Sequence, residues 1–212
     1  MNLFRNTLDY YRENGVWLTY FYTLSRVVAL FRNFFLSHKL RAGRNLRIGP
    51  KADLRGLSNI TIGENFVSSV GLRLEAVIRH GGTRYSPRII IKDNVLVSDY
   101  VHIGAVNHVE IGNGVLMGSK VYITDHGHGT YSGAVQSRPE EPPNARSIKS
   151  DKAVILEDNV WLGESVSILP GVRIGFGIVI TRAKNLVPIR PQHSMMILAM
   201  IMPEKMAYTT SA

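Results

Sequence analysis

The sequence predicts an all-β fold, a left-handed parallel β-helix of hexapeptide repeats, with an N-terminal helical segment and one extruded loop. Three observations predict it. Apolar residues recur at every sixth position over most of the chain, glycine follows several of them, and the period is lost once for about 30 residues. A six-residue period suits neither an α-helix nor an ordinary strand. It is typical of a repeat fold in which each unit buries its apolar face against its neighbours.

The first segment, residues 1–42, differs in character from the rest. Residues 3–36 are rich in Leu, Phe, Tyr and Arg and contain no proline. This composition indicates one or two helices that are apolar over much of their surface. Two compatible interpretations follow. The helices pack on the main domain or on a neighbouring subunit, or they make peripheral contact with a membrane, with arginines on anionic lipid.

The main domain, residues 43–182, carries the repeats. The clearest run places apolar residues six apart, at Leu156, Leu162, Ile168, Ile174 and Ile180. Each hexad makes one short strand and one corner, so three hexads make a triangular coil of about 18 residues, and successive coils stack about 4.8 Å apart. The periodic residues point inward, and the small residue beside several of them is expected to let the backbone turn the corner.

The period breaks in three places. Two residues are gained between Ile103 and Ile111, which predicts a bulge at residues 106–108. The period is lost over residues 125–153, a stretch rich in Gly, Pro and charge, which predicts a loop extruded from the coil. A loop of this length is uncommon in a compact fold unless it is functional. The hexads stop at Ile180, and residues 183–212 form a divergent tail.

Composition narrows the class of protein. The chain has 212 residues, a formal net charge of +9 and no cysteine, which excludes disulfides and thiol catalysis. No secretory signal is visible, and the longest apolar stretch, residues 16–35, is interrupted by Arg26 and Arg32, which does not suit a transmembrane helix. The expected location is therefore cytoplasmic, either free or peripheral on the inner face of the cytoplasmic membrane. Basic residues are scattered and no nucleic-acid motif is present, so nucleic acid is not an expected partner.

His126 is the candidate catalytic residue. It lies in the run Thr124-Asp125-His126-Gly127-His128, where the repeats give way to the loop. A histidine there would be held by the rigid coil and still reach solvent, and histidine titrates near neutral pH as a general base should. The alternative from these residues alone is a polar turn that merely leaves the coil.

A family resemblance gives this histidine a role. The segments 111–128, Asn159-Val160-Trp161-Leu162-Gly163 and 168–172 resemble the hexapeptide-repeat acetyltransferases. The stretch 98–103 and the Asp-His-x-His run resemble the lipopolysaccharide (O-antigen) O-acetyltransferases in particular, with the maltose and galactoside acetyltransferases further off. The resemblance covers roughly residues 60–180. It implies a homotrimer with active sites between subunits, acetyl-coenzyme A as donor, a carbohydrate hydroxyl as acceptor and no required metal.

The resemblance also implies site residues. The catalytic histidine of the family maps onto His126, as the base that takes the acceptor proton. The acceptor-binding positions fall at Asp99 and Asn107, and the surface that lines the coenzyme A cleft falls at Trp161 and Gly163. A tryptophan at such a position can instead cap a coil or fill the trimer seam.

Spacing adds His108 to the candidate site. His108 and His126 are 18 residues apart, as are Asn107 and Asp125. If the bulge leaves the count intact, each pair stacks in adjacent coils, about 5 Å apart. His108 is therefore an expected acceptor-binding residue, although His108 and His128 can also be bystanders.

Two other functions remain open from the sequence. A zinc-dependent β-helix hydratase of the carbonic anhydrase kind needs three converging histidines, and four are available, but the His-x4-His pair of that family is absent. A non-catalytic β-helix scaffold is the other. The divergent tail raises the hypothesis of weakened donor binding, since relatives keep the period where this chain loses it. The sequence does not specify the acceptor sugar, its hydroxyl or its carrier.

Overall fold

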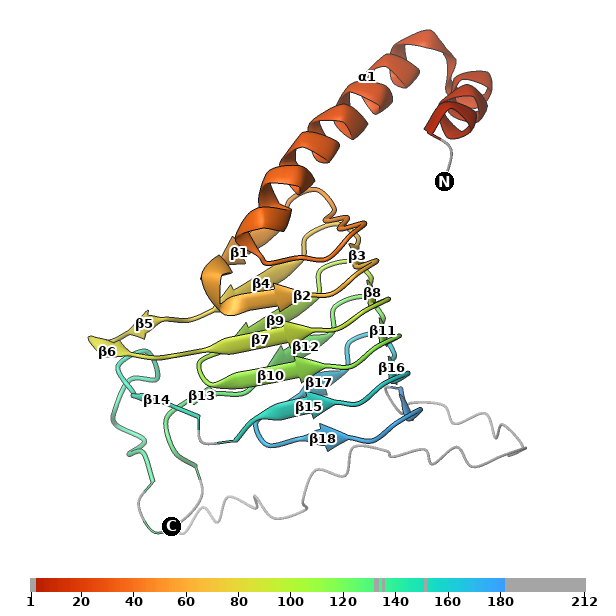
Figure 1. Ribbon diagram of the computed structural model, residues 1–212. Coiled ribbons are helices and arrows are strands. Elements are labelled where there is room, and N and C mark those ends of the chain that lie inside the picture. Colours follow the sequence, from red (N-terminus) through yellow and green to blue (C-terminus); the bar gives the residue numbers. More distant parts are fainter. Residues whose placement is uncertain (1–2, 132–133, 135, 151, 182–212) are drawn as a thin grey trace, which may run out of the picture.

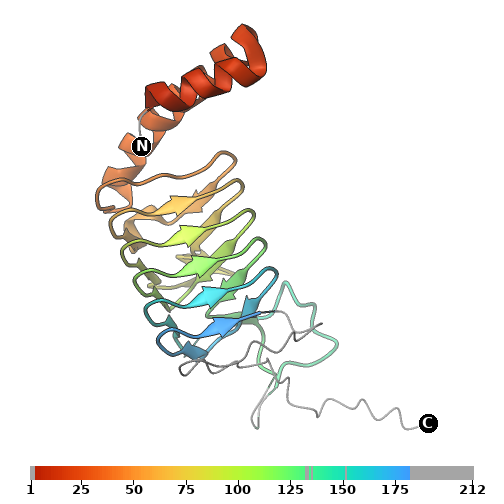
Figure 2. The same cartoon turned by 90° about the vertical axis from the view of Figure 1, so that its right-hand side faces the viewer.

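The computed structural model describes residues 3–131, 134, 136–150 and 152–181, with side chains from residue 7 onward. The predicted tail, residues 183–212, lies outside the described residues. The fold is a left-handed β-helix, a three-sided prism whose coils stack along one axis (Figures 1 and 2). The predicted fold class is therefore confirmed.

Each side of the prism is a five-stranded parallel sheet. The first sheet contains β1 (Asp53–Arg55), β4 (Arg73–Ala76), β9 (His102–Ala105), β12 (Tyr122–Thr124) and β17 (Ser167–Ile168). The second contains β2 (Ile60–Ile62), β7 (Arg88–Ile91), β10 (His108–Ile111), β15 (Val154–Leu156) and β18 (Arg173–Ile174). The third contains β3 (Val67–Ser68), β8 (Leu96–Val97), β11 (Leu116–Met117), β16 (Trp161–Leu162) and β19 (Val179–Ile180). A short 3₁₀ turn, η1 (Leu57–Asn59), joins β1 to β2.

The core is one continuous stack of inward side chains. The periodic residues of the clearest run are all at most 6% exposed: Leu156, Leu162, Ile168, Ile174 and Ile180. They join a single apolar cluster that runs from Leu40 to Ile180. Burial of such side chains contributes about 25 cal/mol per Å² of apolar surface, so this stack supplies the main stabilisation of the prism.

Two corners of the prism repeat a left-handed backbone conformation. Between the second and third sheets a positive φ recurs at Asn65, Asn94, Gly114, Asn159 and Gly177. Between the third and first sheets it recurs at Gly71, Tyr100, Lys120 and Ser165. Asparagine and glycine tolerate this conformation best. The amide of Asn65 also donates to the Asn94 side chain at 2.9 Å, which ties adjacent coils together.

The glycines that follow the periodic residues have a different role from the one predicted. Gly112 does not have a positive φ. A Cβ at this position would lie 2.5 Å from Asp158 Oδ1 and 2.5 Å from the carbonyl carbon of Glu157 in the next coil. Glycine is thus required by the close approach of the neighbouring coil, and the turn itself is made two residues later, at Gly114.

The third corner, between the first and second sheets, holds every long departure from the regular coil. A hairpin of β5 (Arg79–His80) and β6 (Thr83–Arg84) leaves between β4 and β7. The predicted bulge lies between β9 and β10, and because Ile91 pairs with Ile111 this coil holds 20 residues. The predicted loop leaves between β12 and β15 and contains β13 (Gly127–His128) paired with β14 (Ile148–Lys149). The hairpin was not predicted, although a Gly-Gly pair between two short polar strands is a hairpin signal.

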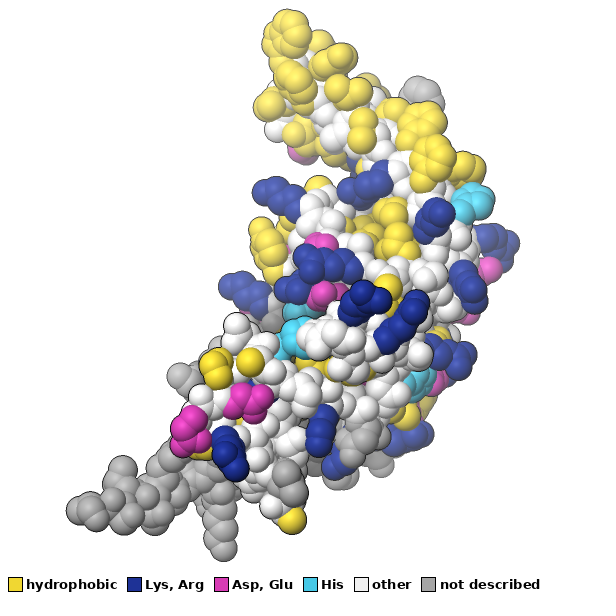
Figure 3. Space-filling view, turned by 90° about the vertical axis from the view of Figure 1, so that its left-hand side faces the viewer, with side chains coloured by type: hydrophobic (Ala, Val, Ile, Leu, Met, Phe, Trp, Pro, Cys, Tyr) yellow, Lys and Arg dark blue, Asp and Glu magenta, His cyan; other side chains and the backbone are white. Residues whose placement is uncertain are grey.

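The N-terminal segment forms α1 (Leu3–Lys39), which is kinked at Gly15 and projects beyond the end of the prism (Figure 1). Its base is fixed: Leu40 is fully buried, Leu36 packs on the core, and the Arg32 guanidinium donates to the carbonyls of Ile48 and Gly49. The rest of α1 exposes large apolar side chains, which form the yellow upper part of Figure 3. Trp17, for example, is 76% exposed. Within the described residues, no helix has the length and apolar character to cross a bilayer.

Candidate active site

His126 lies two residues after the end of β12, at the root of the extruded loop. Strand β12 is paired on both sides, with β9 and β17, so the backbone before the histidine is rigid. The side chain is 15% exposed, so it is sheltered and still accessible. The backbone N–H of His126 donates to Thr124 Oγ1 at 3.3 Å, and the Thr124 hydroxyl lies 3.1 Å from His126 Nδ1. Strand and hydroxyl together fix the position of the imidazole.

A buried carboxylate orients the ring. Asp125 is fully buried, and its Oδ1 lies 2.9 Å from His126 Nδ1. Burial acts to raise the pKa of Asp125, but the hydrogen bond with His126 and those from the backbone N–H groups of Val106 and Asn107 act more strongly together, and the pKa is held below its usual range. An ionised carboxylate can only accept hydrogen bonds. Nδ1–H therefore donates a hydrogen bond to Asp125, so in the neutral ring Nε2 is the nitrogen with the free lone pair that can act as a base.

The bulge of the preceding coil completes the carboxylate site. Asp125 Oδ1 accepts from the N–H of Val106 at 2.9 Å, and Oδ2 accepts from the N–H groups of Asn107 and His108, both at 2.7 Å. Three converging N–H groups form an anion-binding concavity. The bulge thus brings three successive backbone N–H groups, those of residues 106–108, to the Asp125 charge. A bulge beside a site is a known way to redirect such groups.

The predicted stacking of residues 18 apart is wrong. Strands β9 and β12 pair at a 20-residue offset, Ile103 with Ile123, because the bulge adds two residues to the coil. His108 instead begins β10 on the second sheet, where its Nε2 lies 3.5 Å from Glu110 Oε2. Asn107 and His108 do reach the site, but the structure brings them there through their backbone N–H groups.

A second histidine faces His126 across the first sheet. A Cβ placed on Gly104 would lie 3.5 Å from both His102 Nε2 and His126 Cε1, so the two rings converge over this glycine. Burial, followed by the nearby Arg73, lowers the pKa of His102. His102 also contacts the ring of Tyr122, with ring centroids 5.1 Å apart. From the sequence, His102 was counted only among the four histidines available to a zinc site, and Gly104 was not a candidate. A buried glycine between two outward histidines is visible only once the strand register is known.

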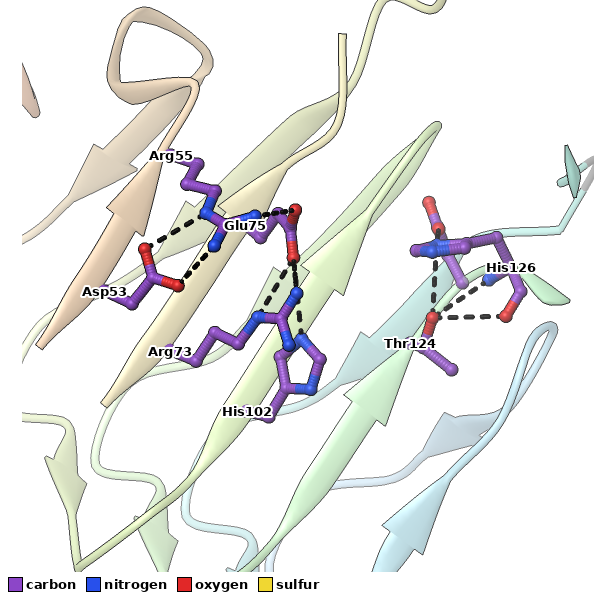
Figure 4. Close-up of polar contacts among 8 residues, drawn as sticks. Asp53, Arg55, Arg73, Glu75, His102, Thr124 and His126 are labelled. Carbon is purple, nitrogen blue, oxygen red and sulfur yellow. Dashed lines mark hydrogen bonds and ion pairs between the residues drawn. The ribbon is translucent and has the colours of Figure 1, made fainter. Parts of the chain in front are cut away.

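Beyond His102 the outward face of the first sheet is a balanced network of charges (Figure 4). Glu75 Oε2 lies 3.9 Å from His102 Nε2 and 2.6 Å from an Arg73 nitrogen. Arg55 lies between Glu75, at 3.4 Å, and Asp53, at 2.8 Å. Two arginines face two carboxylates, so this surface beside His126 offers paired polar groups and no net charge.

The remaining predicted residues lie elsewhere on the same chain. Asp99 is at the corner between the third and first sheets, where its Oδ1 accepts from the Val70 N–H at 3.3 Å. Trp161 lies on β16 of the third sheet, 46% exposed. Gly163 lies just beyond it, where a Cβ would come within 3.3 Å of the Ile180 carbonyl oxygen. Within this chain, Asp99, Trp161 and Gly163 thus lie away from His126.

The hairpin β5–β6 supports the extruded loop. The Tyr85 hydroxyl, just after the hairpin, donates to the Ile148 carbonyl on β14 at 3.1 Å. The rings of His80 and His128 pack with centroids 5.2 Å apart. Strand β13, which carries His128, follows His126 directly, so the hairpin helps to place the loop root. Among the described residues, no group of three or more His, Cys, Asp or Glu side chains is arranged to hold a metal ion.

The structure thus defines a left-handed β-helix with a histidine–aspartate pair at the root of an extruded loop. No family model matches the sequence. The chain is 43% identical over 162 residues to the putative lipopolysaccharide biosynthesis O-acetyltransferase WbbJ of Escherichia coli K12, covering 76% of this chain and 74% of the relative. It is 39% identical over 71 residues to the galactoside O-acetyltransferase of Lactococcus lactis, covering 33% and 30% of the two chains.

Among solved structures, the N-acyltransferase AntD of Bacillus cereus, in complex with dTDP and 3-hydroxybutyryl-CoA, matches with a TM-score of 0.50 and 19% identity over 71% of this chain and 74% of that chain. This likeness concerns the fold alone. The identity and coverage of the first relative show the family: the chain belongs to the hexapeptide-repeat O-acetyltransferases, and it resembles in particular those of lipopolysaccharide biosynthesis.

Proposed function

We propose that the protein transfers the acetyl group of acetyl-coenzyme A to a sugar hydroxyl of a lipopolysaccharide O-antigen or another surface polysaccharide precursor, with His126 as the general base. The observation that carries this proposal is the Asp125–His126 pair, in which a buried carboxylate holds Nδ1 at 2.9 Å and leaves Nε2 free. The relative named for lipopolysaccharide biosynthesis supports the class of acceptor.

The chemistry follows from this orientation. Nε2 of His126 removes the proton of the acceptor hydroxyl while its oxygen attacks the thioester carbonyl carbon. The resulting tetrahedral oxyanion collapses, the carbon–sulfur bond breaks, and His126 returns the proton to the leaving thiolate. Asp125 stabilises the imidazolium that exists between these two proton transfers. A positioned base of this kind contributes about 10² to 10⁴ in rate.

Comparison of His126→Ala with His128→Ala tests the assignment. His128 is two residues away in the same loop and lacks a carboxylate partner among the described residues, so it is a matched control. Because the protein contains no cysteine, any thiol released in the assay comes from coenzyme A. Transfer to a sugar acceptor should fall at least a hundredfold in His126→Ala and change by less than tenfold in His128→Ala. Equal rates in wild type and His126→Ala would remove His126 from catalysis.

The third sheet supports the proposed homotrimer. Its outward column reads Val67, Leu96, Leu116, Trp161 and Val179 in strict register. Leu96, Leu116 and Trp161 are each at least 40% exposed. A continuous apolar column on a sheet of a folded prism marks a surface that another protein covers. A neighbouring subunit on this face would bring its own residues towards Trp161 and Gly163. We propose that Trp161 and Gly163 contact coenzyme A at this interface. Asp99 would reach an acceptor only across the same kind of interface.

We also propose that α1 makes peripheral contact with the inner face of the membrane. Its exposed side chains include Trp17, Phe21 and Phe31, and Arg26 lies among them. Aromatic and basic residues on a helix too short in apolar length to span a bilayer suit the headgroup layer. Deletion of residues 1–36 should reduce sedimentation with phosphatidylglycerol vesicles and leave binding to phosphatidylcholine vesicles unchanged. Equal sedimentation of both forms with phosphatidylglycerol would contradict the proposal.

A further inference from the structure

The outward side-chain layer of the first sheet has a one-residue gap beside His126. Gly104 of β9 holds an outward position, because its two neighbours along the strand belong to the apolar core. It lies in register with Glu75 of β4 and Thr124 of β12, which both carry side chains. Apart from its own chain neighbours, only two described atoms would lie within 4 Å of a Cβ on Gly104: His102 Nε2 and His126 Cε1, each at 3.5 Å. The row is thus interrupted by a hollow whose floor is Gly104.

The fold does not require a glycine at this position. Gly104 has no positive φ, and 3.5 Å is an ordinary van der Waals distance, in contrast to the 2.5 Å at Gly112. Glycine inside a strand weakens it and often marks a bulge, a bend or the close approach of a ligand or another backbone. Gly104 is paired in regular register on both sides, and the atoms nearest to its Cβ position belong to two imidazole rings. The close approach of a ligand is the explanation that remains.

Two imidazoles in different settings border the hollow, with His102 and Glu75 on one side and His126 on the other (Figure 4). Cε1 of His126 is bonded to Nε2, so the proposed base lies at the edge of the hollow. His102 Nε2 is 3.9 Å from Glu75 Oε2, which is too far for a hydrogen bond and leaves this nitrogen free to bind a ligand. Burial, followed by the nearby Arg73, lowers the pKa of His102. The ring is therefore neutral at physiological pH, with one donor and one acceptor.

The groups around His102 suit a neutral ligand that carries hydroxyls. Glu75 beside it is held by Arg73 and Arg55, and the Tyr122 ring lies 5.1 Å from the His102 ring. A phosphate or carboxylate would meet the Glu75 charge, whereas a hydroxyl both donates and accepts, as a neutral imidazole does. The two ring atoms at the hollow lie 3.5 Å from the same point, so they are at most about 7 Å apart, and two hydrogen bonds of about 2.8 Å through one sugar ring span such a gap.

We infer that the hollow over Gly104 receives two neighbouring hydroxyl groups of the acceptor sugar, the reacting one at His126 Nε2 and the next one on the ring at His102 Nε2. The inference rests on the proposed function and deepens it, because it makes the enzyme selective for a vicinal diol. His102 takes no part in the proton transfer. It binds the hydroxyl that is not acetylated and so determines which hydroxyl faces the base.

The first test fills the hollow. Gly104→Ala adds one methyl group at an ordinary contact distance, so the variant should fold, and Gly175→Ala is the matched control, because its Cβ would lie 3.6 Å from its nearest neighbour in the last coil. The probes are the methyl glycosides of glucose, galactose, mannose and rhamnose. For the best acceptor among them, the KM and the Kd from NMR titration should rise about tenfold or more in Gly104→Ala only. The KM for acetyl-coenzyme A and its hydrolysis without acceptor should stay within about threefold of wild type.

The second test removes the neighbouring hydroxyl. NMR of the product identifies the acetylated position, and two monodeoxy glycosides then lack the hydroxyl on either side of it. One of the two should raise the acceptor KM of wild type about threefold to tenfold, the range of one neutral hydrogen bond. This penalty should vanish in His102→Leu and be partly retained in His102→Gln, which keeps a donor and an acceptor. A merely structural role for His102 would leave the penalty equal in all three proteins.

An unchanged acceptor KM in Gly104→Ala would overturn the inference, as would an equal deoxy penalty in wild type and His102→Leu. A parallel loss of acetyl-coenzyme A hydrolysis in Gly104→Ala would also overturn it, since the methyl group would then act through His126, and so would a wild type that binds none of the four glycosides. His126→Ala separates this result from the proposed function, because it should lose transfer and keep glycoside binding. If it retains transfer, the assignment of the base fails, while glycoside binding to Gly104→Ala still decides the role of the hollow.

Discussion

Replacement of Asp125 by asparagine tests the central argument most sharply, because it changes charge and hydrogen bonding with almost no change in shape. The carboxylate is fully buried and accepts four hydrogen bonds, two at each oxygen. An asparagine in the same place keeps one oxygen, which can still accept two of these hydrogen bonds. Its NH₂ group replaces the other oxygen and faces the two remaining donors, which then lack an acceptor. A buried donor left unsatisfied costs about 1–3 kcal/mol, so the variant should lose about 3 kcal/mol of unfolding free energy.

The effect on catalysis has a separate cause. Without the carboxylate, Nδ1 of His126 is no longer held as the proton-bearing nitrogen, so the fraction of rings with a free Nε2 falls and the imidazolium loses its counter-charge. The kcat for acetyl transfer should decrease about 10²- to 10⁴-fold, with little change in the KM for acetyl-coenzyme A. Release of coenzyme A thiol and urea unfolding measure the two effects on the same preparation.

The control for this experiment is Asp93→Asn. Asp93 Oδ1 accepts the backbone N–H of Glu64 at 2.7 Å at another corner of the prism, far from the proposed base. That variant should lose stability and retain kcat. Should Asp125→Asn be folded and keep its kcat within about threefold of wild type, the argument that a buried carboxylate orients the base would be refuted.

Three further predictions concern the prism and its titration. Gly112→Ala should destabilise the fold by about 2–4 kcal/mol in urea unfolding because its Cβ would lie 2.5 Å from the next coil. The control Gly175→Ala, whose Cβ would have no neighbour closer than 3.6 Å, should cost less than about 1 kcal/mol. Similar losses in the two variants would contradict the close-approach argument. Since the folded pKa of Asp125 is depressed, its stabilising contribution is present above the unfolded value of about 3.9 and is lost as pH falls through the folded pKa. The difference in unfolding free energy between wild type and Asp125→Asn should therefore be full at pH 7 and shrink below about pH 4, and a difference that grows on acidification would show the opposite sign. Leu116→Arg on the third sheet should convert a trimer to monomers in light scattering at micromolar concentration, and an unchanged trimer would place the interface elsewhere.

The repeats are the part of the fold that the sequence determined without help. A six-residue period in the inward positions can be satisfied only by short strands separated by corners, because the same residues must meet again in each coil. This is why the core residues Leu156 to Ile180, the bulge and the extruded loop could all be predicted. The candidate base followed from its place at the loop root and from the family resemblance.

Only the tertiary structure decided which distant residues meet. The offset between β9 and β12 depends on the two bulge residues, and it moved His108 to another sheet while turning its N–H towards Asp125. The convergence of His102 on His126 and the contact of the hairpin with the loop join segments separated by tens of residues. Local sequence fixes which side chains point outward, but the length of each coil fixes which of them become neighbours, and that length is set by insertions whose path no local pattern specifies.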